Sequence, residues 1–360
     1  MLYTVLRKVT FDGKIIIIDS SQNIREFGNG NRLVKIKLKN KSIETKLFRN
    51  PALHLGEGYM NEEILIQKGT IEELIDIVTA CYDDFIRNNS IYRFYENFSG
   101  YVKVFQQLNE AVKSKQNVAH HYDLKEDLYK LFLDKDMQYS CAYFHNENIS
   151  LDQAQIDKKN HIINKLQIKE NMSVLDIGCG WGGMALEIAK QTGAKVKGIT
   201  LSENQFATAS RRAQEEGISD KVSFQIQDYR DEKLKYDRIV SVGMFEHVGI
   251  KFYKTFFKTI NKLLKDDGVT LLHTIGSIDK PSPGSPFITK YIFPGGVIPS
   301  YSQIIKPLEA SGLVVSDVET LIRHYDKTLE SWLERFMNKR SEVKDLFDEK
   351  FVRCWEFYMA

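Results

Sequence analysis

The chain has 360 residues, of which 42% are hydrophobic and 11% aromatic. This composition excludes a disordered protein, and the length predicts about two to three domains with sizeable cores. A formal net charge of +2 creates no overall field that would argue for a nucleic acid partner.

Targeting signals and cysteine usage both indicate a cytoplasmic protein. The first residues, MLYTVLRKVTFDGKIIII, lack the apolar core and cleavage site of a signal peptide, and no window holds the about 18 apolar residues of a membrane-spanning helix. The four cysteines, at positions 81, 141, 179 and 354, have no C-x-x-C spacing. We therefore expect reduced thiols, without disulfides or a zinc site.

The first hundred residues predict a small domain of mixed sheet and helix. In NRLVKIKLK (31–39) apolar residues alternate with lysines, which predicts a strand with one solvated face. Thr70 and Glu73 have the spacing of a capping box at the start of an amphipathic helix. The polar stretch 109–123 predicts a junction, so we expect an N-terminal accessory, lipid-docking domain at 1–105, a linker at 106–125 and a catalytic domain at 126–360.

From about residue 160 strands and helices alternate, which predicts an α/β domain with a mostly parallel, doubly wound sheet. Six strands are expected, at 173–178, 194–201, 221–228, 237–243, 268–276 and 313–321. Helices are expected at 182–193 and 251–265, and Ser202 with Gln205 has the capping-box spacing of a further helix start. In such a sheet the ligand lies beyond the carboxyl ends of the strands.

The stretch VLDIGCGWGG (174–183) carries the spacing G-x-G-x-x-G at Gly178, Gly180 and Gly183. A nicotinamide site would need an acid at the tip of the second strand, but that strand ends in Gly-Ile-Thr at 198–200. Instead Asp176 precedes the glycines and Asp228 ends the third strand. This set resembles class I S-adenosylmethionine methyltransferases, in which glycines admit the cofactor and carboxylates accept its hydrogen bonds. The plain alternative is a glycine turn that only closes the corner between strand and helix.

A closer resemblance rests on several ordered segments over roughly residues 90–340. They are VAHHYDL (118–124), MQYSCAYF (137–144), GITLSENQ (198–205), QDYRD (227–231), DRIVSVGMFEHVG (237–249), LLHTIG (271–276), IFPGG (292–296) and HYDKTL (324–329). Together with the glycine stretch they resemble the cyclopropane-fatty-acyl-phospholipid synthase family, which includes enzymes like the mycolic acid cyclopropane synthases. The N-terminal region is similar to that family only around NPALHLGEGYM (50–60).

The resemblance implies transfer of a methylene group from S-adenosylmethionine to the cis double bond of an unsaturated acyl chain of a membrane phospholipid. A bound bicarbonate is the base that the family uses to close the ring, and the matching holders are Cys141, Glu246, His273, Tyr325 and the backbone of Ile275. The implied cofactor contacts, with Asp176 added from the superfamily pattern, are Tyr122, Ser140, Asp176, Gly178, Gly180, Thr200, Gln205, Asp228 and Tyr229.

Each of these residues also has a structural interpretation. Cys141, His273 and Tyr325 taken singly resemble core residues, whereas Glu246 follows the fourth strand, where a carboxylate faces the ligand crevice. A related enzyme that makes a methyl-branched acyl chain or methylates a small amine, and a lipid-binding relative without activity, stay open as alternatives. An amine brings its own lone pair, so the complete anion set disfavours the amine methyltransferase.

Membrane contact and the C-terminus leave further alternatives. The segment KIKLKNKSIETK (35–46) holds five lysines, which either face anionic lipid at the inner face of the cell membrane or form a solvated strand face. The segment PFITKYIFPGGVIP (286–299) either borders an acyl tunnel or packs the sheet. The family continues with a final strand, whereas this sequence stops at CWEFYMA. We expect a sheet that lacks its last strand, in a fragment or in a chain whose exposed edge another copy covers in a homodimer.

Overall fold

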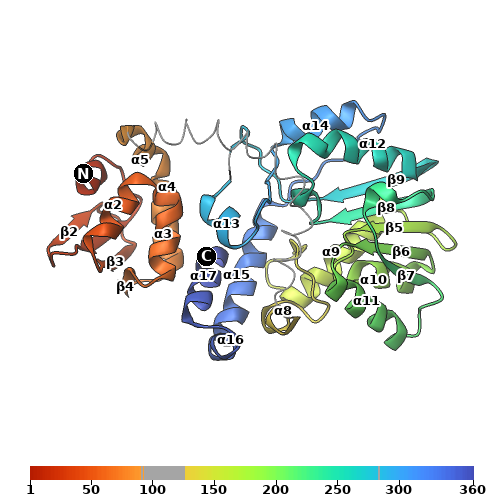
Figure 1. The fold of residues 1–360 in the computed structure, drawn as a ribbon, viewed down its shortest axis with the longest axis horizontal. Coiled ribbons are helices and arrows are strands. Elements are labelled where there is room, and N and C mark those ends of the chain that lie inside the picture. Colours follow the sequence, from red (N-terminus) through yellow and green to blue (C-terminus); the bar gives the residue numbers. More distant parts are fainter. Residues whose placement is uncertain (91, 93–125, 283) are drawn as a thin grey trace. The chain divides into compact units, whose positions relative to one another are not determined.

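The structure is a computed structural model that describes residues 1–90, 92, 126–282 and 284–360 (Figure 1). The chain forms two compact units, the first from residues 1–106, 283–292 and 336–360 and the second from residues 107–282 and 293–335. The predicted linker at 106–125 lies outside the described residues. The last 25 residues, predicted as part of the catalytic domain, pack with the N-terminal unit.

The N-terminal unit contains a four-stranded mixed sheet. Its strands are β1 (Lys14–Ile18), β2 (Ile24–Phe27), β3 (Leu33–Leu38) and β4 (Ile64–Lys68), in the order β2-β1-β3-β4. Strands β1 and β3 are parallel, and the two outer pairs are antiparallel. Along β3, Val34, Ile36 and Leu38 are buried while the lysines between them are half-buried, which confirms the predicted alternation.

Among the described residues, five helices cover one face of this sheet, namely α1 (Leu2–Leu6), α2 (Lys41–Arg49), α3 (Pro51–Met60), α4 (Ile71–Ala80) and α5 (Tyr82–Asn88). The same unit contains α13 (Pro286–Tyr291) and α17 (Glu349–Met359), which pack on α3, and α16 (Arg340–Leu346), which packs on α17. The predicted capping box of α4 is confirmed, since Glu73 N–H donates to Thr70 Oγ1 and Thr70 N–H to Glu73 Oε2. Helix α17 packs on α3, where Arg353 donates to the Tyr59 carbonyl at 2.7 Å. This contact explains why the C-terminal helices belong to the N-terminal unit.

The second unit contains a five-stranded sheet, and all its strands are parallel. The strands are β5 (Ser173–Ile177), β6 (Lys195–Thr200), β7 (Val222–Ile226), β8 (Tyr236–Val242) and β9 (Leu264–His273), in the order β7-β6-β5-β8-β9. The fold class is therefore confirmed: a class I methyltransferase-like parallel sheet beside a smaller unit with its own mixed sheet.

The prediction of a sixth strand at 313–321 is wrong, because this segment carries no strand. The segment does not pair with a strand and is held by polar contacts with the helix Leu151–Leu166. Glu319 accepts a hydrogen bond from His161 at 2.7 Å and forms an ion pair with Lys165 at 2.8 Å. Val314 is 91% exposed and Val315 and Val318 are also exposed, so the valines that suggested a strand face solvent instead of a core.

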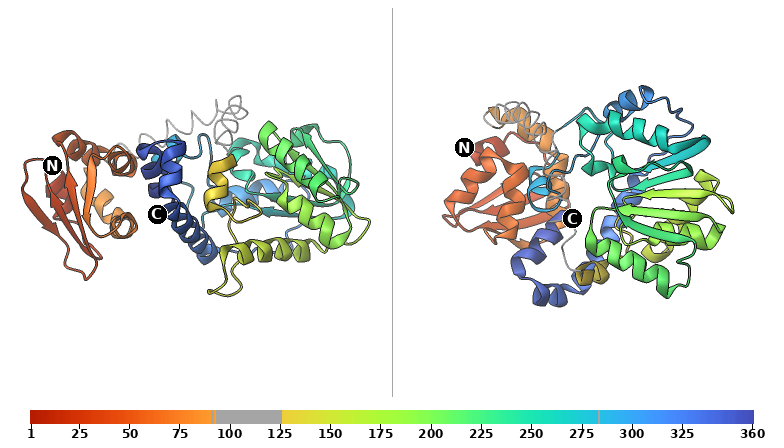
Figure 2. Two further views of the ribbon diagram at one scale, coloured as in Figure 1. Left: turned by 90° about the horizontal axis from the view of Figure 1, so that it is seen from below. Right: turned by 45° about the vertical axis from the view of Figure 1, so that its right-hand side comes forward.

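Alternate residues of the strands face two helical layers. Val174, Val196 and Val240 pack with α9 (Leu151–Leu166), α10 (Gly183–Thr192) and α11 (Glu203–Glu215). Leu175, Ile199 and Ile239 pack with α12 (Tyr253–Leu263) and α14 (Tyr301–Glu309) on the other face (Figures 1 and 2). This arrangement is doubly wound, as predicted, and it leaves the carboxyl ends of the strands for the loops that carry the site.

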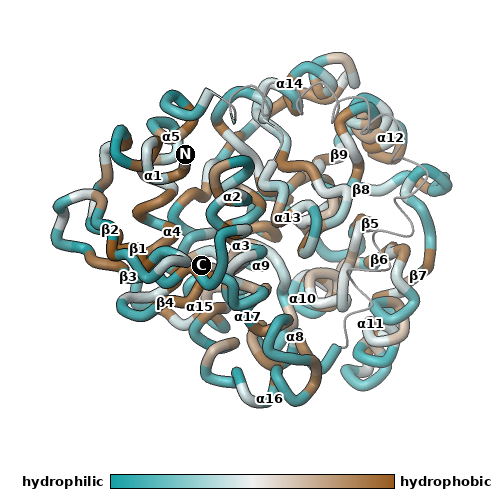
Figure 3. Tube along the Cα trace, turned by 60° about the vertical axis from the view of Figure 1, so that its left-hand side comes forward, coloured by the Kyte–Doolittle hydropathy of each residue, from teal (hydrophilic) through white to brown (hydrophobic). Residues whose placement is uncertain are grey.

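Short elements and one long helix complete the second unit. The short elements are α8 (Glu126–Phe132), η2 (Tyr229–Asp231), η3 (Phe245–His247) and η4 (Ile250–Phe252), and the long helix is α15 (Ile322–Asn338). Figure 3 shows hydrophilic and hydrophobic stretches within single helices such as α12, as expected of helices that bury one side. Within the described ranges, no helix combines the length and apolarity needed to cross a membrane.

Candidate active site

The predicted site residues follow the carboxyl ends of the five parallel strands. Asp176 lies near the end of β5, Thr200 ends β6, Asp228 follows β7, Glu246 follows β8 and His273 ends β9. Because parallel strands present these ends at one edge, residues nearly a hundred positions apart in sequence reach a common region.

The glycine loop after β5 adopts backbone conformations that are unfavourable for residues other than glycine. Gly178, Gly180 and Gly182 all have positive φ, and the N–H groups of Gly178 and Cys179 both donate to the Ile199 carbonyl, at 2.9 and 3.0 Å. A Cβ on Gly178 would lie 2.6 Å from the Met244 Cβ, whereas a Cβ on Gly180 would meet nothing within 4 Å. Gly180 is therefore the point where the loop backbone borders open space that a ligand can approach.

Asp176 is a buried carboxylate that lacks a full set of partners. Its side chain is 2% exposed, and Oδ2 accepts no hydrogen bond from the described residues. Burial raises the pKa of Asp176 to about 7. A buried acceptor without a donor is costly, so this oxygen fits the polar hydrogens of a ligand such as the expected cofactor.

We expect Asp176 to make the ligand-free protein less stable as pH rises. Its folded pKa of about 7 lies above the unfolded value, so the folded state loses stability as pH rises from the unfolded pKa through the folded one. Comparing Asp176→Asn with the wild type by urea unfolding at about pH 5 and pH 8 should show that the variant loses roughly 3 kcal/mol less across this interval. An equal loss in both proteins would contradict a buried, ionising Asp176.

The end of β6 forms a local hydrogen-bonded unit. Thr200 Oγ1 donates to Gln205 Oε1 at 2.9 Å and accepts from the Ser202 N–H at 3.2 Å. Ser202 caps α11 by accepting from the Gln205 N–H, but the Gln205 side chain turns to Thr200, so only half of the predicted capping box forms. The unit fixes Thr200 and Gln205, the two expected cofactor contacts, against each other.

The expected contacts after β7 are partly engaged within the protein. Asp228 caps η2 and forms an ion pair with Arg230 at 2.6 Å. The ring of Tyr229 packs edge-on against Phe256, with centroids 5.4 Å apart. A ligand that binds Asp228 must therefore share this carboxylate with Arg230. Tyr122, a further expected contact, lies outside the described residues.

The expected anion holders Glu246, Ile275 and His273 lie at the ends of β8 and β9. Glu246 Oε1 accepts the Ile275 N–H at 2.7 Å, while Glu246 Oε2 and His273 Nδ1 are buried without a partner in the described part of the chain. The Ile275 N–H, expected to face the anion, is thus occupied by Glu246. Burial raises the pKa of Glu246 and lowers that of His273 to about 4, so this imidazole is neutral.

Cys141 and Tyr325 belong to two segments that hydrogen bonds bring together. The Ala142 N–H donates to Thr328 Oγ1 at 3.0 Å and the Phe144 N–H to His324 Nδ1 at 2.9 Å. These bonds fix α15, which carries Tyr325, to the segment that carries Cys141. Cys141 is 6% exposed and burial raises its pKa to about 11, so the thiol stays protonated and able to donate.

Sequence reasoning missed the polar residues of α9 that support this segment. Gln155 donates to the Ser140 carbonyl at 3.0 Å, and Lys158 Nζ donates to Ser140 Oγ at 2.7 Å. Both residues lie on the buried face of α9, in register with Ala154 and Ile162. A lysine in the apolar register of a helix was the signal that could have found them.

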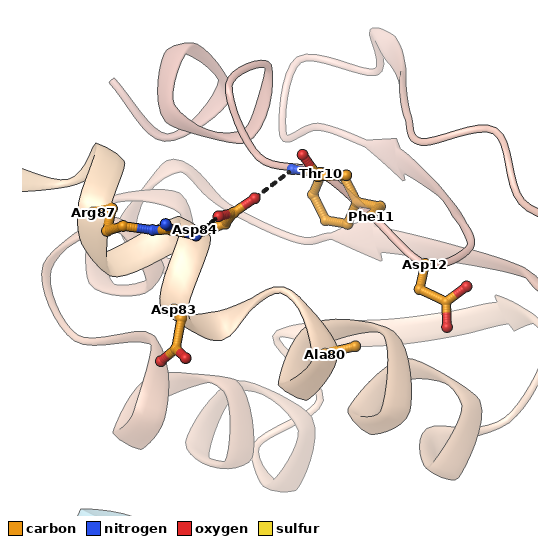
Figure 4. A pocket seen from close by; sticks show the side chains of 7 residues that line it. All are labelled: Thr10, Phe11, Asp12, Ala80, Asp83, Asp84 and Arg87. Carbon is orange, nitrogen blue, oxygen red and sulfur yellow. Dashed lines mark hydrogen bonds and ion pairs between the residues drawn. The ribbon is translucent and has the colours of Figure 1, made fainter.

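A hollow in the N-terminal unit is separate from these residues. It lies between the segment before β1 and helices α4 and α5, and its Asp84 pairs with Arg87 and accepts the Thr10 N–H at 3.2 Å (Figure 4). None of the predicted site residues lines it. Two of its carboxylates are already paired, Asp84 with Arg87 and Asp12 with Arg32, and the hollow adds nothing to the candidate site.

Comparisons with known proteins identify the family of this chain. The mycolic acid cyclopropane synthetase family matches residues 109–360, and a domain of unknown function matches residues 3–90. The cyclopropane-fatty-acyl-phospholipid synthase of Escherichia coli K12 is 38% identical over 92% of this chain and 84% of that protein. Cyclopropane mycolic acid synthase 1 of Mycobacterium tuberculosis H37Rv is 37% identical over 68% of this chain and 90% of its own length.

Solved structures are similar as well. A mycolic acid cyclopropane synthase in complex with SAH and CTAB has a TM-score of 0.65 and 34% identity, covering 68% of this chain and 90% of that one. Coclaurine N-methyltransferase, at 20% identity and a TM-score of 0.69 over 85% of this chain and 92% of that one, shares the fold.

Proposed function

The chain belongs to the mycolic acid cyclopropane synthetase family of S-adenosylmethionine-dependent methyltransferases, and from that premise we propose that it adds a methylene group to cis double bonds of membrane phospholipid acyl chains. One observation carries the proposal. Among the described residues, the buried atoms Glu246 Oε2 and His273 Nδ1 have no hydrogen-bond partner, and they lie near strand ends where the family resemblance implies an anion that serves as base.

The residues present fit S-adenosylmethionine. The open space at Gly180 and the unpartnered Asp176 Oδ2 offer a backbone approach and a hydrogen-bond acceptor, and Thr200 with Gln205 lies at the next strand end. When bound, the cofactor supplies an activated methyl group on sulfur. The protein's own part is to hold the reactants in line and to exclude water, because an alkene is a weak nucleophile and gains most from proximity in a dry site.

Ring closure also needs a base, since a proton must leave the transferred methyl group. We assign Cys141, Glu246, His273 and Tyr325 to the binding of bicarbonate, which would accept that proton, and Ile275 to the positioning of Glu246 through its N–H. The protonated thiol of Cys141 and the neutral imidazole of His273 can donate to or accept from such an anion. An amine methyltransferase would have no use for this set.

Lipid analysis tests the proposal. Vesicles of phospholipid with cis-unsaturated chains, incubated with the protein and S-adenosylmethionine, should gain one CH₂ per modified chain by mass spectrometry and show cyclopropane protons by NMR. A saturated methyl-branched product would replace the proposal with the branching alternative. Unchanged lipids under conditions where the protein binds S-adenosylmethionine would refute it.

A face of the N-terminal sheet supports contact with the inner, anionic face of the cytoplasmic membrane. By register, the side of the sheet away from its helices carries both basic and apolar residues, namely Lys14, Ile16, Ile18, Lys35, Lys37, Leu65 and Lys68. Lys14 is paired with Glu26 at 2.7 Å. Lys39 and Lys41, grouped with the other lysines in the sequence, lie past the end of β3.

We expect the triple variant Lys35→Gln, Lys37→Gln, Lys68→Gln to bind anionic vesicles roughly a hundredfold more weakly, at about 1 kcal/mol per lysine. Its binding should also depend less on salt. The matched control removes three exposed lysines from α12, at Lys254, Lys258 and Lys262, and should bind as the wild type does. Equal losses in both variants in a vesicle sedimentation assay would show that only overall charge matters.

A further inference from the structure

Lys158 is a buried cation without a carboxylate partner. Its side chain lies on the buried face of α9 and is 2% exposed. Nζ donates to two neutral oxygens, Gln138 Oε1 at 2.9 Å and Ser140 Oγ at 2.7 Å. Within the described residues no carboxylate lies close enough to form an ion pair with it. A buried ammonium in this state is costly unless something else supplies negative charge.

The neighbouring Lys159 shows how the same helix holds a lysine whose role is structural. Lys159 is equally buried, at 3%, but it pairs with Asp136 at 2.7 Å and Glu187 at 3.0 Å. Its pKa is raised despite burial, chiefly by Asp136. Burial lowers the pKa of Lys158 to about 8. The two lysines are almost equally buried, but only Lys159 forms ion pairs with carboxylates among the described residues.

Lys158 lies beside the expected anion site. Ser140, which it contacts, precedes Cys141 in the chain, and the Lys158 charge adds to burial in lowering the pKa of His273. Cys141 in turn raises the pKa of Lys158. The ammonium of Lys158 therefore interacts electrostatically with Cys141 and His273, two of the residues assigned to the anion site.

Other charges around Lys158 come from the loop before Ser140 and from its own helix. Asp134 and Asp136 raise its pKa and Lys159 lowers it. Asp136 is engaged by Lys159 and Arg212, and Asp134 accepts the Gln138 and Asp136 N–H groups. Asp136 is therefore already paired with two cations, whereas Asp134 is the strongest negative charge acting on Lys158 but forms no ion pair with it among the described residues.

The anion holders themselves bring no positive charge. Cys141 is a protonated thiol, His273 is a neutral imidazole, Tyr325 is a phenol and Glu246 is an acid. An anion taken from water into such a site needs a countercharge. We propose that the ammonium of Lys158 is that countercharge and determines how tightly the site retains bicarbonate. This inference rests on the proposed function, because it assumes that bicarbonate occupies the site.

The test measures the bicarbonate concentration that half-saturates ring formation. Lys158→Met keeps the unbranched side chain up to the position of Cε and removes the charged group. It should raise that concentration roughly tenfold to a hundredfold, the scale of a hydrogen bond or contact to a charged group. Saturating bicarbonate should restore much of the maximal rate. Lys158→Arg keeps the charge and should lie between the variant and the wild type.

Lys159→Met is the matched control from the same helix. It removes an equally buried charge that is already paired, so it should lower thermal stability while leaving the half-saturating bicarbonate concentration unchanged. A purely structural Lys158 would behave like this control. In the wild type, raising the pH through about 8 should weaken bicarbonate retention as the ammonium loses its proton, and Lys158→Met should show no such change.

Two failures are distinguishable. Wild-type activity that is independent of bicarbonate would overturn the proposed base, and this inference with it. Wild-type activity that needs bicarbonate, with an unchanged half-saturating concentration in Lys158→Met, would overturn the role of Lys158 alone. If Lys158→Met does not fold, the pH series on the wild type decides: constant bicarbonate retention across pH 8 would overturn the inference.

Discussion

Glu246→Gln is expected to reduce ring formation by about 10² or more, the scale seen when a positioned acid-base or electrostatic group is removed. The amide has the shape of the acid, and its oxygen can still accept the Ile275 N–H that Glu246 Oε1 now accepts at 2.7 Å. What changes is the second position, where an NH₂ group replaces the unpartnered Oε2. An acceptor that could orient the anion becomes a donor.

S-adenosylmethionine affinity should change little in Glu246→Gln, because the substitution leaves Asp176 and the glycine loop intact. Asp237→Asn is a suitable control, since Asp237 lies at the opposite end of the same strand β8 and binds Ser173 and Lys265. That control should be less stable yet make the normal product. Wild-type cyclopropane yield from Glu246→Gln, measured by lipid mass spectrometry, would show that Glu246 only packs the site.

Gly180→Leu is expected to abolish S-adenosylmethionine binding. A side chain at this position would extend into the space that meets no protein atom within 4 Å of an added Cβ, which is the space assigned to the cofactor. The substitution also places a residue other than glycine at φ +53, at a cost of roughly 1–2 kcal/mol. Isothermal titration calorimetry measures the loss directly.

Gly217→Leu separates the filled space from the backbone strain. Gly217 has φ +67, and an added Cβ there also meets nothing within 4 Å, but it lies in the turn between α11 and β7. This control should be destabilised by a similar amount and bind S-adenosylmethionine normally. Equal binding by both variants would mean that the open space at Gly180 is not the cofactor site, and tight NAD binding by the wild type would overturn the cofactor assignment.

Features that depend on neighbouring residues could be predicted from the sequence. The capping box at Thr70, the alternation along β3 and the five strands of the large sheet all follow from local chemistry and periodicity. The order of polar residues at the ends of those strands was also predictable, because the carboxyl ends of parallel strands share one edge. The segment 313–321 is rich in valine, as strands are, and its sequence does not reveal that α9 holds it through Glu319.

The sequence by itself therefore determined the class of fold, the glycine loop and the list of groups at the strand ends. Only the tertiary structure decided how those groups are paired: that Glu246 takes the Ile275 N–H, that Arg230 engages Asp228, and that Lys158 bonds to Ser140 and forms no ion pair with a carboxylate of the described residues. The reason is physical. Whether a polar group is buried, charged or satisfied depends on partners brought close in space from distant parts of the chain, such as Ala142 and Thr328, which are 186 residues apart.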